Sequence, residues 1–179
     1  MEHPTPGLLV QVAESLEQAD ASTRAQRASR IVWLGQAGVH FISDRDTVEK
    51  QSMRGEAISC YIGGQHIACL LVALAYIEHA VFDELAITGA AQYGDTLSFE
   101  KSLRLAKERL LLDAGLVDRA DALRLKRNPY AHVKKPGHMH ALGTRYRSEK
   151  AHPASLTEAD AQEALLVLVG LYNSTLRPA

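Results

Sequence analysis

The long apolar run at residues 67–87, IACLLVALAYIEHAVFDELAI, constrains the fold more than any other feature. Its most apolar part, residues 67–77, is shorter than the roughly 20 residues that a membrane span needs, and Glu78 and His79 close it. Apolar residues recur along the run at helical spacing, namely Ala68, Leu71, Ala75, Phe82 and Leu85. The run therefore predicts a buried core helix, with Glu78 on an adjoining flank.

Proline placement extends this prediction to most of the chain. Apart from Pro6, no proline lies between Thr5 and Arg127, and strand-like alternation is weak throughout. With 179 residues, of which 46% are hydrophobic, the chain can form one domain with a sizeable core. We therefore expect an all-α bundle of five to six helices, in a single domain spanning residues 1–179.

Turn signals and helical periodicity divide this domain into segments. We expect breaks at YIGGQH and TGAAQYGDT, a helix beginning near Thr96 or Ser98, and Thr157 as N-cap of the last helix with Asp160 completing a capping box. Residues 1–22 would form an N-terminal helical extension, and residues 133–155 a basic loop before the last helix. The other expected helices are 8–19, 23–37, a short one within 41–56, 67–87, 117–126 and 156–176.

Cysteine and histidine content argues against a metal or disulfide scaffold. Cys60 and Cys69 are nine residues apart and belong to no metal-ligand spacing. The pair His138 and His140 lacks a clear third ligand, even with His152 nearby, so we expect no metal and no cofactor. Because the N-terminus also lacks the features of a secretory signal, a reducing cytoplasm is the expected location, with no membrane partner.

Charge is unevenly distributed along the chain. Residues 101–150 contain 13 Lys and Arg against 5 Asp and Glu, whereas the whole chain has a net charge of −1. This basic segment indicates either an anionic ligand or ordinary solvated helix faces, and the charge alone does not separate the two.

The basic segment contains RNPYAH, residues 127–132, in which Arg127 continues an apolar row of the preceding helix. Such an arginine needs an acceptor; Glu78 either supplies it inside the bundle or remains a charge at a helix edge. Pro129 suits the first position of a new helix and Asn128 its N-cap. Arg127 and His132 would then meet beside the backbone N–H groups of a helix start, which together form a phosphate site. The alternative is a structural Arg/His pair at an ordinary Asn-Pro helix start.

RNPYAH resembles the R-x4–6-H motif of HEPN domains, including the polar residue after the arginine. The segments CLLVALAYIEHAVFDEL, LSFEKSLRLAKERLLLDAGLVDRADALRLKRNPYAHVKKPGH and EADAQEALLVLVGLYN are similar to the helices that surround that motif, so that the resemblance covers most of the chain. The resemblance implies a compact helical bundle that forms a homodimer, with the arginine and histidine of two subunits facing one another. It also implies a metal-independent endoribonuclease, as a toxin or phage-defence component, or a module that has lost activity.

In the implied site the catalytic residues are Arg127, Asn128 and His132. His132 would transfer a proton during attack by the RNA 2′-OH, Arg127 would hold the phosphate, and Asn128 would orient the imidazole or cap a helix. Tyr130 would either stack on a base or belong to the core. The RNA backbone would be held by basic residues, namely Lys126, Lys134, Lys135, Arg145 and Arg147.

Three functions remain open from the sequence. The first is a dimeric ribonuclease that acts on RNA. Its protein partner would be a nucleotidyltransferase-type antitoxin or another protein of the same operon. In the family, the antitoxin-modified proteins have a tyrosine two residues after the histidine, where this chain has Lys134. The second is a non-catalytic module that binds RNA or a protein partner. The third is a structural dimer in which the Arg/Asn/His cluster only secures the interface.

Overall fold

The computed structural model describes residues 6–39 and 46–175, and these residues form helices and connecting segments without a strand. The all-α prediction is confirmed, with seven helices in this part of the chain instead of five to six. Their bounds are α1 Pro6–Gln36, α2 Val48–Ile62, α3 His66–Ile87, α4 Phe99–Glu108, α5 Ala114–Ala131, α6 Leu142–Glu149 and α7 Pro153–Ser174. Within the described residues, no helix is both long and apolar enough to cross a membrane.

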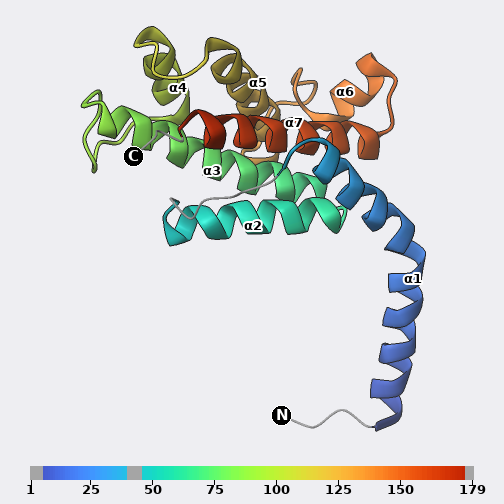
Figure 1. Cartoon of the computed structure of the whole chain (residues 1–179). Coiled ribbons are helices and arrows are strands. Elements are labelled where there is room, and N and C mark those ends of the chain that lie inside the picture. The colour runs from blue at the N-terminus through green and yellow to red at the C-terminus, as the bar shows by residue number, and fades with distance from the viewer. Residues whose placement is uncertain (1–5, 40–45, 176–179) are drawn as a thin grey trace.

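Helix α3 lies at the centre of the bundle, between α2 on one side and α4, α5 and α7 on the other (Figure 1). The expected stripe along α3 is only half-buried apart from Leu85, whereas side chains such as Leu70, Leu74 and Ile77 are completely buried. The predicted apolar face covers too small a part of the helix surface, because neighbouring helices pack against α3 on several sides. A helix that is apolar around most of its circumference is typical of such a position.

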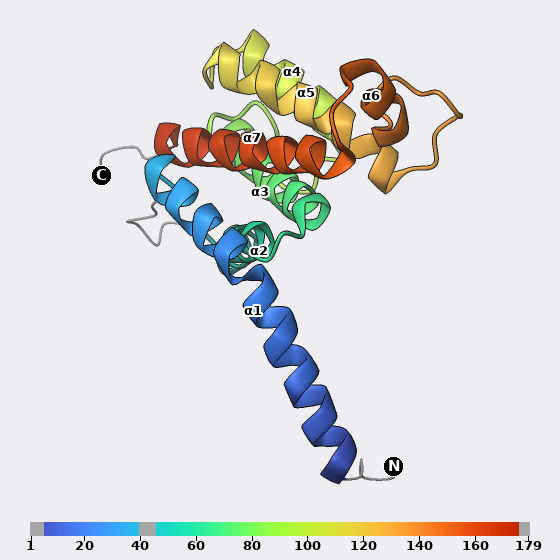
Figure 2. The ribbon, with the colours of Figure 1, turned by 90° about the vertical axis from the view of Figure 1, so that its right-hand side faces the viewer.

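Helix α1 is a single helix and not the expected pair 8–19 and 23–37. The hydroxyls of Ser22 and Thr23 donate hydrogen bonds to the Ala19 carbonyl, which keeps these polar residues compatible with a continuous helix. Only the C-terminal end of α1 rests on the bundle, where the Trp33 ring lies 5.1 Å from that of Tyr61. The rest of α1 projects away from the bundle in both views (Figures 1 and 2).

Side-chain caps fix the starts of several helices. The hydroxyls of Thr47 and Ser98 cap α2 and α4, and the Asp113 carboxylate accepts a hydrogen bond from the Leu116 N–H at the start of α5. The Ser98 start and the break at YIGGQH agree with the sequence predictions. Helix α2 is longer than the expected short helix, of which residues 41–45 lie outside the described part.

The region before the last helix differs from its prediction. The expected loop 133–155 contains α6, and α7 begins earlier than expected, at Pro153 with His152 as its N-cap. Thr157 is therefore not a cap, and Asp160 lies buried inside α7. Proline at the first helical position explains this earlier start. The expected C-terminal end of the last helix, residue 176, lies outside the described residues.

Candidate functional site

Helix α5 runs through the RNPYAH motif without a break, which corrects the predicted helix start. Pro129 lies inside the last turn, Asn128 has no capping role, and His132 is the C-cap, with its N–H bonded to the Asn128 carbonyl at 2.9 Å. Proline is tolerated here because its missing N–H affects only one bond, near the helix end. The backbone at His132 thus belongs to a helix C-terminus, which favours cations and not phosphate.

Arg127 faces α3 and pairs with Glu78 across a distance of 3.8 Å between Nη2 and Oε2. Of the two expectations for Glu78, the pairing with Arg127 is the one observed. The separation is too long for a hydrogen bond, so the guanidinium keeps donors for another acceptor. Positions 127 and 132 are five residues apart on α5 and therefore do not share a helix face. The predicted contact between Arg127 and His132 within one chain is not formed.

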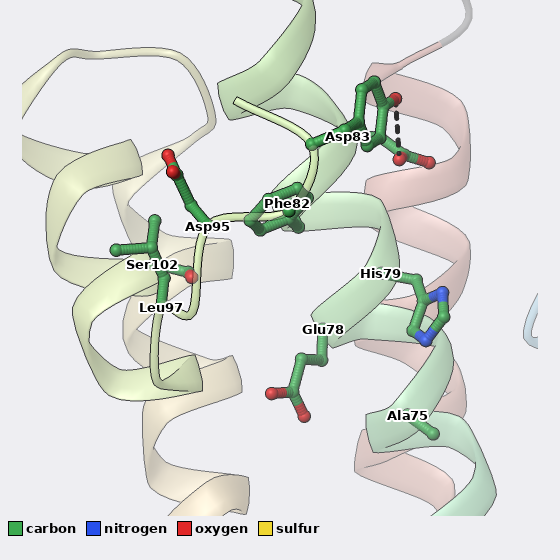
Figure 3. A pocket seen from close by; sticks show the side chains of 10 residues that line it. Ala75, Glu78, His79, Phe82, Asp83, Asp95, Leu97 and Ser102 are labelled. Carbon is green, nitrogen blue, oxygen red and sulfur yellow. Dashed lines mark hydrogen bonds between the residues drawn. The ribbon is translucent and has the colours of Figure 1, made fainter. Parts of the chain in front are cut away.

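Glu78 also lines a cavity of about 420 Å³ between α3, the segment before α4, and α4 itself (Figure 3). Asp83 and Asp95 add two more carboxylates, and the Tyr93 hydroxyl donates a hydrogen bond of 3.2 Å to Asp83. The charge of Asp83, followed by burial, raises the pKa of Tyr93. Among the described residues that line this cavity there is no lysine or arginine, although Lys50 pairs with Asp83 at 2.8 Å from outside the lining. The lining itself therefore favours no phosphate.

Two of the expected RNA-binding residues instead belong to a buried cluster. Arg145 is 5% exposed and makes a bidentate pair with Asp160, which is 1% exposed. Lys126 Nζ donates to the same carboxylate at 2.8 Å, and Arg145 Nε donates to Glu149 at 3.0 Å. This cluster joins α5, α6 and α7, so Arg145 is not available to a phosphate backbone.

Tyr130 packs against the hydrophobic core, and its buried hydroxyl has no hydrogen-bond partner among the described residues. Burial, and then the charge of Asp160, raises the pKa of this hydroxyl. Of the two expectations for Tyr130, packing against the core is the one observed, and the residue is partly buried.

The remaining expected residues form an exposed basic surface. His132, Lys134 and Lys135 are exposed at the end of α5 and in the segment that follows, and Arg147 is exposed on α6. Exposed apolar side chains accompany them, namely Val133, Met139 and Tyr146. We call the basic and apolar residues of 132–135, together with Met139, Tyr146 and Arg147, the α5–α6 surface.

The three histidines considered for a metal have local roles. The His140 N–H donates to His138 Nδ1 at 3.3 Å, and His152 Nδ1 accepts from the Ala154 N–H at 3.2 Å as the cap of α7. Within residues 6–39 and 46–175, no three His, Cys, Asp or Glu side chains are grouped so that they could hold a metal ion.

Sequence reasoning missed the role of Asp160, although a signal for it existed. Asp160 lies four residues after Leu156 and four before Ala164, in a row that is otherwise apolar. An acidic residue in such a row needs a buried cation, and the basic segment 101–150 was the obvious source of one.

A second missed residue is His66, at the start of α3. It is buried, its Nε2 has no hydrogen-bond partner among the described residues, and the nearest carboxylate oxygen, Glu158 Oε1, is 3.8 Å away. Burial lowers the pKa of His66. The sequence predicts a break at YIGGQH, but nothing there indicates that the histidine is enclosed.

Comparison with known proteins found no related protein. No protein-family model, no curated protein sequence and no solved structure matches the chain. The candidate site therefore rests on the chain's own residues: Arg127 held near Glu78, His132 exposed at the end of α5, and the basic α5–α6 surface beside it.

Proposed function

We propose that the protein is a metal-independent endoribonuclease of the HEPN type, whose site is completed when two subunits bring Arg127 and His132 together. The observation that carries this proposal is the exposure of His132 together with Lys134 and Lys135, which follow it in the chain. An exposed imidazole in a basic setting can reach an RNA backbone, whereas the cavity near Glu78 is lined by carboxylates.

A second subunit is needed because Arg127 and His132 of the same chain do not meet. Arg127 is directed toward α3, and His132 lies five residues further along α5. One histidine per chain also supplies only one proton-transfer group, whereas transesterification requires a proton acceptor and a proton donor. In a symmetric pair, the arginine of each subunit would act with the histidine of the other.

The reaction needs only these groups. The 2′-OH of the RNA attacks the adjacent phosphorus as an imidazole takes its proton, and the 5′-oxygen leaves with a proton from a second group. The products are a 2′,3′-cyclic phosphate and a 5′-hydroxyl. Arg127 would stabilise the charge of the phosphorane, once it turns from Glu78 toward the phosphate.

The test is a cleavage time course on structured and unstructured RNA with EDTA present. We expect cyclic-phosphate products from the wild type and none from His132→Ala or Arg127→Ala, each verified as folded by its thermal transition. A matched control is His138→Ala, because His138 lies nearby but outside the motif. Wild-type protein that cleaves none of the RNAs would contradict the proposal, as would His132→Ala at wild-type rate.

A second candidate is a non-catalytic module that binds RNA through the α5–α6 surface. The pairing of Arg127 with Glu78 favours it, because an arginine held by a carboxylate can be purely structural. This candidate predicts salt-dependent RNA binding without turnover, in both the wild type and His132→Ala.

A further inference from the structure

The projecting part of α1 exposes an apolar stripe that none of the described residues covers. Leu9 is 55% exposed, Val12 48% and Leu16 64%. Residues 6–26 extend roughly 30 Å beyond the bundle, at 1.5 Å per residue (Figure 2). A helix this exposed gains little from tertiary packing, which is the usual source of helix stability, so a partner is required.

The stripe is continuous with the face by which α1 rests on its own bundle. Leu9, Val12, Leu16 and Ala19 follow one another at steps of three and four residues, and we call these four residues the outer stripe. The same steps lead through Thr23 to the residues that contact the bundle. Those residues are Arg30, which is half-buried and donates a hydrogen bond to the Ile62 carbonyl, and Leu34, which is buried.

We infer that the outer stripe packs antiparallel against the outer stripe of a second copy of this chain. In the register centred on residue 14, Leu9 lies opposite Ala19 and Val12 lies opposite Leu16. The two-fold axis repeats both pairs, so the paired helices have four apolar layers. In the two Leu9–Ala19 layers, a large side chain packs against a small one. The two bundles then lie at opposite ends of the paired helices, so this pair is separate from the pairing of α5 ends in the proposed function.

The bundle itself excludes the parallel arrangement. From residue 30 onward the stripe is covered by the chain's own bundle, on the side that faces the partner helix. A parallel partner would have to continue through that bundle. In the antiparallel pair, residue 6 of the partner lies opposite residue 22, so the described part of the partner helix avoids that bundle.

Charge also favours a second copy over a membrane. Between residues 6 and 23 the only charged residues are Glu14, Glu17 and Asp20. Glu14 and Glu17 lie on the side of α1 opposite the outer stripe, so they do not repel each other across the seam. An anionic bilayer would repel the same acidic face, because helices that lie on membranes usually carry lysine and arginine there.

The test measures molar mass in solution by light scattering, for the wild type and for two variants. Val12→Glu combined with Leu16→Glu buries four carboxylates in the paired stripe and should weaken association at least about 100-fold. Val10→Glu is the matched control, because Val10 is 58% exposed but lies off the stripe. The thermal transition of each variant verifies that the bundle is folded.

We expect the double variant to have half the mass of the wild-type assembly, and Val10→Glu to retain the wild-type mass. A wild type that remains at 19.6 kDa at high concentration would overturn the inference and would leave another protein as the occupant. A double variant of wild-type mass would also overturn it. Neither result depends on ribonuclease activity, since these residues lie far from α5 and the bundles do not meet in this pair.

Spin labels test the orientation separately. With the partly exposed Cys60 replaced by serine, Ser22→Cys supplies one labelling site on each α1. In the antiparallel pair the two positions are about 24 Å apart along the helices, whereas in a parallel pair they are about 10 Å apart. A short distance would overturn the antiparallel arrangement.

Discussion

Removing the Asp160 carboxylate tests whether the buried cluster organises the basic surface. In Asp160→Ala, Arg145 would remain buried without its bidentate partner, and Lys126 would lose its 2.8 Å hydrogen bond. Breaking a buried ion pair by removing one partner costs about 3–5 kcal/mol of unfolding free energy. For a chain of this length, such a loss lowers the melting temperature by roughly 6–20 °C.

Calorimetry or denaturant unfolding measures this change, with Asp118→Ala as the matched control. Asp118 also pairs with a lysine, Lys107, but both side chains are exposed, so its removal should cost less than about 1 kcal/mol. Equal losses in the two variants would refute the reasoning that the cluster is buried and costly to break. We also expect Asp160→Ala to lose RNA affinity, because the cluster holds α6 and Arg147 beside α5.

Three further results are expected. Because burial lowers the pKa of His66, the imidazole binds a proton less readily in the folded chain than in the unfolded chain. The free energy of unfolding should therefore fall as the pH drops below about 6.5. Unfolding measured at several pH values should show that His66→Gln loses this dependence. Gly170→Ala places a methyl group 2.6 Å from Cδ2 of Leu116 on α5, the end of a flexible side chain that must turn aside, so it should lower the free energy of unfolding relative to Gly143→Ala, which is in open space. Equal free energies of unfolding in the two variants would contradict this packing. Lys134→Ala and Lys135→Ala should each lower the slope of log affinity against log salt by about 0.7 for single-stranded RNA in binding titrations, and an unchanged slope would exclude contact with phosphate.

The helices that the sequence predicted well are those with strong local signals. The apolar run of α3, the glycines before it and the Ser98 cap are all local, and the structure agrees with each. Helix α1 was predicted as two helices, 8–19 and 23–37, although the hydroxyls of Ser22 and Thr23 can bond within a single helix.

The candidate site was less predictable because it depends on helix ends and on distant contacts. An Asn-Pro pair fits a helix start, but it also fits a last turn, and local sequence does not distinguish the two. The partners of Arg145 and Lys126 could not be assigned because α7 brings Asp160 to them only in the folded bundle. The pairing of Arg127 with Glu78 was one of two alternatives that the sequence left open, because Arg127 ends an apolar row and needs an acceptor, and it is the one observed.

The most direct test of the proposed site mixes two inactive variants, Arg127→Ala and His132→Ala, and measures RNA cleavage with EDTA present. If each site combines the arginine of one subunit with the histidine of the other, a mixed dimer contains one intact site. After subunit exchange, an equal mixture should then recover about a quarter of the wild-type activity, since half of the dimers are mixed and each has one working site of two. A mixture as inactive as either variant alone, beside a wild type that cleaves, would contradict the shared site.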